Sequence, residues 1–187
     1  NRRTFSRILK FCRNIDAKLI YSGSSTKFSQ KSSQYVSSPY ELSKVENVAT
    51  LNWYAALTNL RFATVYFYNV YGPNEKSTGK YATVVAKFLH QYAKNQPLTI
   101  RLPGIQKRNF THVNDIVDGL IKVALQGNGD GFAIGNPKSY SISELADLIS
   151  DKQVRLPPVS GNRMAAEIDL SQVFELGWQP KYELEKY

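Results

Sequence analysis

Hydrophobic and polar residues alternate with two different periods along the first seventy positions. Apolar side chains recur at three- and four-residue spacing between residues 2 and 14 and predict a helix there. Residues 17–21 form a short apolar run typical of a buried strand, which ends in the small polar residues 22–26. A second helix is expected over 39–58, and the aromatic and β-branched run 61–67 predicts the next strand.

The expected start of the second helix carries its own signature. Ser38 suits the N-cap, Pro39 the first helical position, and Glu41 the position that closes a capping box. Tyr40 and Lys44 follow within the first turns of this helix.

Weaker patterns continue through the rest of the chain. They predict helices at 81–95, 114–126, 141–150 and just after Asp169, and extended segments at 98–101, 108–113 and 131–135. Strands that alternate with helices in the first seventy residues favour a parallel α/β sheet, and the later half favours a smaller mixed lobe.

Composition excludes several classes of protein. The chain has 187 residues with 42% hydrophobic and 12% aromatic content, which is ordinary for a globular protein. No run approaches the roughly 20 apolar residues of a membrane helix, and the first residues lack the apolar core of a secretory signal. A lone cysteine, Cys12, has no partner for an internal disulfide. We therefore expect a soluble, cytoplasmic protein, and no metal site is predicted.

The formal charge of +9 suits a polyanionic partner. Its 24 Lys and Arg residues are scattered in ones and twos, without a basic run or a nucleic-acid-binding motif. This distribution favours solvated charge with a few phosphate contacts over a nucleic-acid surface.

Tyr40, Lys44 and Ser24 form the clearest chemical pattern. Tyr40 and Lys44 lie four residues apart on one helix, so their side chains share a face. A nearby ammonium favours the phenolate and can bring a tyrosine into the range of a working base. Ser24, at the end of the preceding strand, can donate a hydrogen bond to the same substrate oxygen. Alone, the Tyr–Lys spacing is more often a surface pair.

The order of these motifs resembles the extended short-chain dehydrogenase/reductases, in the nucleotide-sugar epimerase and dehydratase branch that includes UDP-glucose 4-epimerase. The resemblance covers nearly the whole chain. It rests on Ser24 in its small-residue cluster, S-P-Y-E-L-S-K at 38–44, N-V-Y-G-P at 69–73, G-I-Q-K-R-N-F-T-H-V-N-D at 104–115, and L-G-W-Q-P at 176–180.

The resemblance implies roles for individual residues. Ser24, Tyr40 and Lys44 match the catalytic positions, and Tyr40, Lys44 and Phe67 match cofactor contacts to NAD, with NADP not excluded. Ser24 and four further residues match contacts to a nucleotide-diphosphate sugar, expected to be UDP-linked: Asn69, Arg101, Arg108 and Arg163.

The same resemblance implies the fold and the assembly. Residues 1–73 would be the second half of a Rossmann-type parallel sheet domain, and 74–187 a smaller mixed α/β substrate-binding lobe, with about 108–135 returning to the first domain. Helices 2–14 and 39–58 would form a homodimer interface. His112, Trp53 and Trp178 are interpreted as packing residues, although Trp53 also suits the dimer interface.

Departures from the family pattern narrow the expected reaction. Ser25 and Thr26 replace the acidic pair of the dehydratases, so simple dehydration is disfavoured. Arg101 stands where the family usually has an aromatic residue near the base. No G-x-x-G-x-x-G turn follows a strand, so the usual dinucleotide phosphate site is missing from these residues. We expect the chain to be either a fragment of a longer protein or a natural truncation.

The leading hypothesis is NAD-dependent epimerisation of a nucleotide-diphosphate sugar by transient oxidation and re-reduction of one sugar carbon. One alternative is a nucleotide-sugar reductase or dehydrogenase that releases its cofactor. The other is a catalytically silent, truncated relative.

Overall fold

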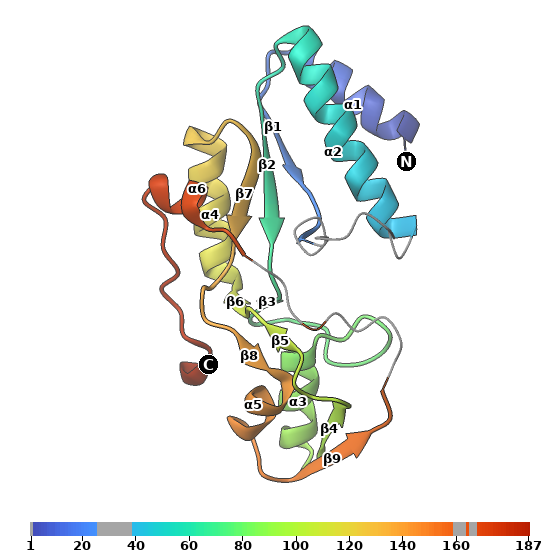
Figure 1. Cartoon of the computed structure of the whole chain (residues 1–187), viewed down its shortest axis with the longest axis vertical. Coiled ribbons are helices and arrows are strands. Elements are labelled where there is room, and N and C mark those ends of the chain that lie inside the picture. The colour runs from blue at the N-terminus through green and yellow to red at the C-terminus, as the bar shows by residue number, and fades with distance from the viewer. Residues whose placement is uncertain (1, 26–38, 159–163, 165–167) are drawn as a thin grey trace. The chain divides into compact units, whose positions relative to one another are not determined.

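Two compact units make up the chain, and each draws on segments far apart in the sequence. The computed structural model describes residues 2–25, 39–158, 164 and 168–187 (Figure 1). The described parts of Asn1–Phe67, Ile116–Ile134 and Glu167–Gln179 form the first unit, and those of Tyr68–Asp115, Gly135–Ala166 and Pro180–Tyr187 form the second. The sequence-based division sets its boundary at residue 73 instead, with about 108–135 as the returning segment.

A parallel sheet forms the centre of the first unit. Its strands lie in the order β1 (Leu19–Ser22), β2 (Phe62–Phe67) and β7 (Gly129–Ile134). Parallel neighbours require a crossover connection, and α2 (Pro39–Thr58) lies between β1 and β2 in the chain. The expected parallel α/β arrangement is confirmed for this unit.

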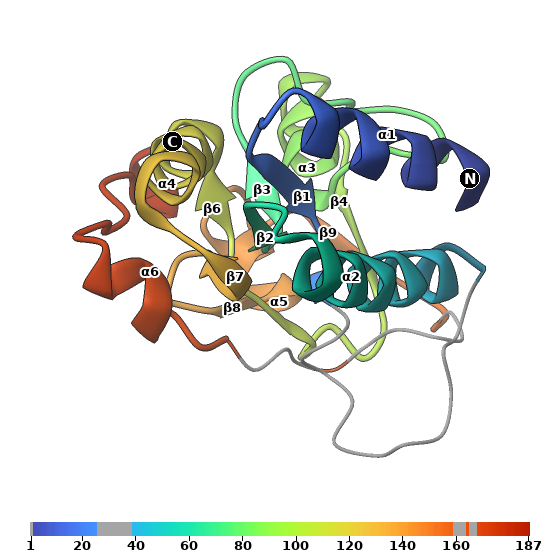
Figure 2. The same cartoon turned by 90° about the horizontal axis from the view of Figure 1, so that it is seen from above.

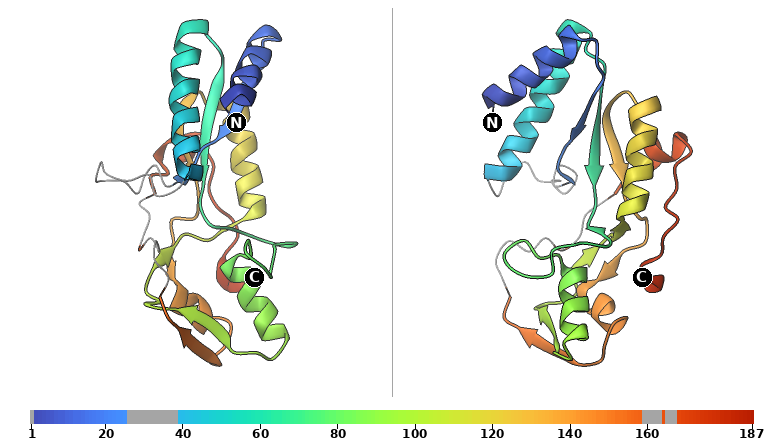
Figure 3. Two further views of the ribbon diagram at one scale, coloured as in Figure 1. Left: turned by 90° about the vertical axis from the view of Figure 1, so that its right-hand side faces the viewer. Right: turned by 180° about the vertical axis from the view of Figure 1, so that it is seen from behind.

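Helices cover both faces of this sheet. Figures 2 and 3 show α1 (Arg2–Asn14) and α2 on one face, and α4 (Val113–Gln126) on the other. The predicted bounds 2–14 and 39–58 agree with α1 and α2, although Ser38 lies outside the described residues. Among the residues that the structure describes, no helix is long and apolar enough to span a membrane.

One apolar cluster joins α1 and α2 to the sheet. Its buried members are Phe5, Leu9, Leu51, Ala55 and Leu60, and half-buried side chains such as Cys12 and Tyr21 pack against them. Burying each large aliphatic side chain contributes about 1.5–3 kcal/mol. Trp53 does not belong to this core: it faces outward from α2 and is 66% exposed, so its interpretation as a core residue is wrong.

The opposite face of the sheet is held by α4. A side chain at Gly119 would lie 2.7 Å from Ile134 and 3.0 Å from the Trp178 indole, so only glycine lets the helix approach this closely. Trp178 is buried, as predicted. It follows the short helix α6 (Ser171–Glu175), whose first backbone N–H donates to the Asp169 carboxylate.

The second unit consists of short pairs of strands and short helices. Sequence patterns do not predict the strand at Gln153–Leu156 (β9), which pairs in parallel with the strand at Leu98–Arg101 (β4). The pairs are β3 (Val70–Tyr71) with β6 (Thr111–His112), β4 (Leu98–Arg101) with β9 (Gln153–Leu156), and β5 (Lys107–Arg108) with β8 (Tyr140–Ser141); the helices are α3 (Val84–Ala93), α5 (Ile142–Asp147) and the 3-10 turn η2 (Leu184–Lys186).

Two groups of hydrogen bonds stabilise the second unit. Ser141 and Glu144 form the capping box expected from the sequence, with both reciprocal hydrogen bonds present. The buried Asp115 carboxylate accepts hydrogen bonds from the backbone N–H groups of Lys181 and Tyr182. His112 is buried and stacks on the Tyr182 ring at 4.3 Å, so it acts as a packing residue, as interpreted.

A charged cluster anchors the chain near its last turn. The Glu185 carboxylate accepts hydrogen bonds from the Lys138 ammonium and the Tyr140 hydroxyl. These bonds, that from Lys138 foremost, lower the pKa of Glu185 to about 2. Because the carboxylate form is the one bound in the fold, its contribution to stability is present above the ordinary pKa of 4.5 and is lost as the pH falls toward 2.

We predict that Glu185→Gln lowers the midpoint of urea unfolding at pH 7, because the ionic hydrogen bonds are lost. The difference from the unchanged protein shrinks as the pH falls from 4.5 toward 2. Urea denaturation followed by circular dichroism at several pH values measures both. A difference that stays constant across this range contradicts the assignment.

Candidate active site

The end of β1 and the first two turns of α2 bring the predicted catalytic residues into one region of the first unit. Ser24 follows β1 by two residues, Tyr40 is the second residue of α2, and Lys44 lies one turn further along. The first unit therefore holds all three.

Gly23 sets the path of the chain as it leaves the sheet. Its N–H donates to the Val65 carbonyl at 2.9 Å, which continues the pairing of β1 with β2. A side chain here would lie 2.4 Å from the Tyr66 ring. Only glycine therefore lets Ser24 follow directly beside Tyr66.

Lys44 reaches from α2 to the end of β1. Its ammonium donates to the Ser22 carbonyl at 2.8 Å. It also lies 5.1 Å from the centroid of the Tyr21 ring and 5.9 Å from that of Tyr40. Loss of water around the half-buried ammonium lowers the pKa of Lys44.

Tyr40 presents its ring at the surface of the first unit, with 62% of the residue exposed. The Lys44 ammonium lies 5.9 Å from the centroid of this ring. The ring is thus accessible to a ligand while it stays beside a fixed cation.

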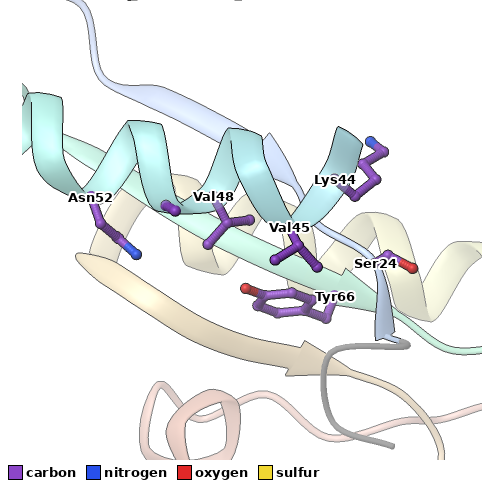
Figure 4. A pocket seen from close by; sticks show the side chains of 7 residues that line it. Ser24, Lys44, Val45, Val48, Asn52 and Tyr66 are labelled. Carbon is purple, nitrogen blue, oxygen red and sulfur yellow. The ribbon is translucent and has the colours of Figure 1, made fainter. Parts of the chain in front are cut away.

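A cavity of about 240 Å³ extends from Ser24 and Lys44 along one face of α2. Figure 4 shows Val45, Val48 and Asn52 of the helix on one side of it, with the Tyr66 ring on the other. The Tyr66 hydroxyl is held by the Asp130 carboxylate at 2.6 Å. This volume suits one ring of a ligand rather than a whole dinucleotide.

The remaining predicted residues divide between the two units. Phe67 is the last residue of β2 in the first unit, where it pairs with Ile134. Asn69 in the second unit is exposed, and its backbone carbonyl accepts from Thr111 N–H at 3.2 Å. Arg163 lies outside the described residues.

Two arginines of the second unit are the last residues of their strands. Arg101 is the last residue of β4, exposed, and donates to the Pro157 carbonyl at 3.4 Å. Arg108 is the last residue of β5 and donates to the Lys107 carbonyl at 2.7 Å.

Sequence reasoning missed the groups that surround Lys44. The sequence places Tyr21 only in an apolar strand and indicates no role for Asn47, which donates to the Tyr21 hydroxyl at 3.1 Å. The one available signal was the position of Asn47, three residues after Lys44 on the same helix face.

Comparison with known proteins identifies the family. The model of the NAD dependent epimerase/dehydratase family matches residues 1–135. The chain belongs to this family. The resemblance drawn from the sequence motifs is therefore confirmed, and the family is NAD dependent by its description.

Curated relatives differ in the reaction that their names give. UDP-glucuronic acid decarboxylase 3 of Arabidopsis thaliana is 33% identical over 134 residues, which cover 67% of this chain and 37% of that protein. UDP-glucose 4-epimerase of Mycolicibacterium smegmatis is 31% identical over 155 residues, covering 79% and 49%. The family is thus one of nucleotide-sugar enzymes with more than one outcome.

Solved structures share the fold over nearly the whole chain. UDP-glucose 4-epimerase of Thermotoga maritima, solved with UDP-glucose, matches with a TM-score of 0.87 at 23% identity, covering 97% of this chain and 64% of that one. The α/β fold with parallel sheets is therefore shared. The chain spans less than two thirds of the length of each of these relatives.

Proposed function

We propose that this chain supplies the proton-transfer and sugar-binding residues for NAD-dependent epimerisation of a nucleotide-diphosphate sugar, with UDP as the nucleotide. The observation that carries the proposal is Lys44, fixed to the Ser22 carbonyl beside the exposed ring of Tyr40. Family membership and the UDP-sugar names of the relatives support it.

Tyr40 is the proposed base and acid. Its phenolate takes the proton from one sugar hydroxyl as that carbon is oxidised, and returns it when the carbon is reduced. Ser24 donates a hydrogen bond to the same sugar oxygen, and the Lys44 ammonium stabilises the phenolate. Lys44 and the cavity beside it would hold NAD, which would supply reversible hydride transfer at the sugar carbon.

The residues present fit one end of this cofactor. The Lys44 ammonium is a donor for ribose hydroxyls, and the cavity beside it accommodates one ring. Phe67 is the further proposed contact. No G-x-x-G-x-x-G run occurs in the 187 residues, so we assign no phosphate contact of NAD to this chain.

The second unit is proposed to hold the nucleotide-diphosphate sugar. Arg108 and Arg163 suit the diphosphate because a guanidinium can bind two oxygens at once. Asn69 contacts the sugar, and Arg101 stacks its planar group on the base.

Decarboxylation is the second candidate reaction, because a UDP-glucuronic acid decarboxylase reaches 33% identity. Both reactions begin with the same oxidation of the sugar. They differ in whether the oxidised sugar loses carbon dioxide before hydride returns.

The proposal is tested by an activity assay on protein that mass spectrometry shows to hold NAD. We predict that it interconverts UDP-glucose and its epimer, and that Tyr40→Phe lowers the rate by about 10²–10⁴ because acid–base catalysis is lost. Tyr81→Phe, at an exposed tyrosine of the second unit, is the control and keeps the rate. Chromatography of the sugar nucleotides measures both.

Three results of this assay contradict the proposal in different ways. Carbon dioxide released from UDP-glucuronic acid without any epimer indicates the decarboxylase. Net accumulation of NADH indicates a dehydrogenase. Protein that never retains NAD contradicts NAD-dependent catalysis by this chain.

We also propose a homodimer through α1 and α2. Both helices expose large apolar side chains in the first unit: Ile8 and Phe11 from α1, and Trp53 and Leu57 from α2. Ile15, directly after α1, is also exposed. Apolar side chains gathered on adjacent helices are typical of a symmetric interface.

Trp53→Glu is expected to shift the protein from dimer to monomer, because an interface charge without a partner is costly. Leu125→Glu, at an exposed leucine of α4, is the matched control and leaves the dimer intact. Sedimentation velocity distinguishes the two states. Equal sedimentation of both variants contradicts the proposed interface.

A further inference from the structure

Tyr21 of β1 lies against the ammonium of Lys44. Its ring centroid is 5.1 Å from Lys44 Nζ, closer than the Tyr40 ring at 5.9 Å. The next residue, Ser22, accepts the hydrogen bond from the same ammonium at 2.8 Å. A cation within about 6 Å of an aromatic face is attracted by the negative charge of the ring. Two consecutive strand residues thus hold the end of Lys44.

Neighbouring side chains fix the Tyr21 ring. Asn47 Nδ2 donates to the Tyr21 hydroxyl at 3.1 Å, and Asn47 and Lys44 leave α2 from the same face. The Phe5 ring packs on Tyr21 with its centroid 5.0 Å away and a tilt of 54°. The ring is therefore held from both α1 and α2.

The Tyr21 ring also stabilises the positive charge of the half-buried Lys44 ammonium. Burial removes water from the ammonium and lowers the pKa of Lys44, which disfavours its charged form. The Ser22 carbonyl satisfies one of its three N–H donors. An aromatic face stabilises positive charge without competing for the others.

We propose that Tyr21 is a positioning residue for Lys44: the face of its ring holds the ammonium in place at the end of β1. The inference rests on the proposed function, in which Lys44 acts on Tyr40. Without the ring, the long lysine side chain regains rotamers and leaves its place beside Tyr40.

The test is a titration of Lys44 by nuclear magnetic resonance, in protein whose lysines carry carbon-13 at Cε. Lys44→Met assigns the signal. Tyr21 is replaced by phenylalanine and then by phenylalanines with one, three and five fluorines. This series keeps the shape of the ring and the fold while it removes negative charge from the ring face.

We expect Tyr21→Phe to leave the Lys44 pKa within about 0.2 unit, because the ring face remains. The pKa then falls with each added fluorine, by about half a unit or more for the fully fluorinated ring. The same series at Tyr54 is the control, since that ring packs against the same apolar cluster. No change is expected there.

Equal titration of Lys44 across the Tyr21 series overturns the proposal, as does an equal shift from the Tyr54 series. The titration needs neither NAD nor a sugar. A stepwise shift in a protein without epimerase activity therefore refutes the proposed function alone, whereas activity without a shift refutes only the role of Tyr21.

Discussion

The hydrogen bond from the Lys44 ammonium to the Ser22 carbonyl joins helix α2 to the end of strand β1. This contact depends on the order and direction of the strands in the sheet. Because β1 and β2 are parallel, the chain crosses from the end of one strand to the start of the other through α2. The amino-terminal turns of α2 reach the carboxyl end of β1, where Lys44 binds the Ser22 carbonyl and lies beside the Tyr40 ring.

The elements that the sequence predicts best have strong local signals. Residues 2–14 and 39–58 agree with α1 and α2 because helical periodicity, and for α2 a proline at the first position, act within the segment itself. β9 is missed because its four residues, of which only Val154 and Leu156 are apolar, are too short a pattern to indicate a strand. They become one by pairing with β4, more than fifty positions earlier.

In the candidate site, too, the sequence predicts local features but not contacts between distant segments. Spacing on one helix is enough to pair Tyr40 with Lys44, and motif order is enough to suggest the family. The contacts of Lys44 with Tyr21 and Ser22 join a helix to a strand more than twenty positions earlier, so no spacing rule reveals them. The interpretation of Trp53 as a core residue is wrong for a different reason. An aromatic residue inside a helix does not reveal which face of the helix is exposed.

The central claim is that Tyr40 and Lys44 serve an oxidation that is reversed on the same sugar. Deuterium on the ring carbons of UDP-glucose tests it most directly, with NAD-loaded protein and mass analysis of the products. We predict an epimer that keeps all its deuterium, since the hydride leaves one carbon and returns to the same carbon. An epimer that has exchanged deuterium for solvent hydrogen, or no epimer at all, contradicts it.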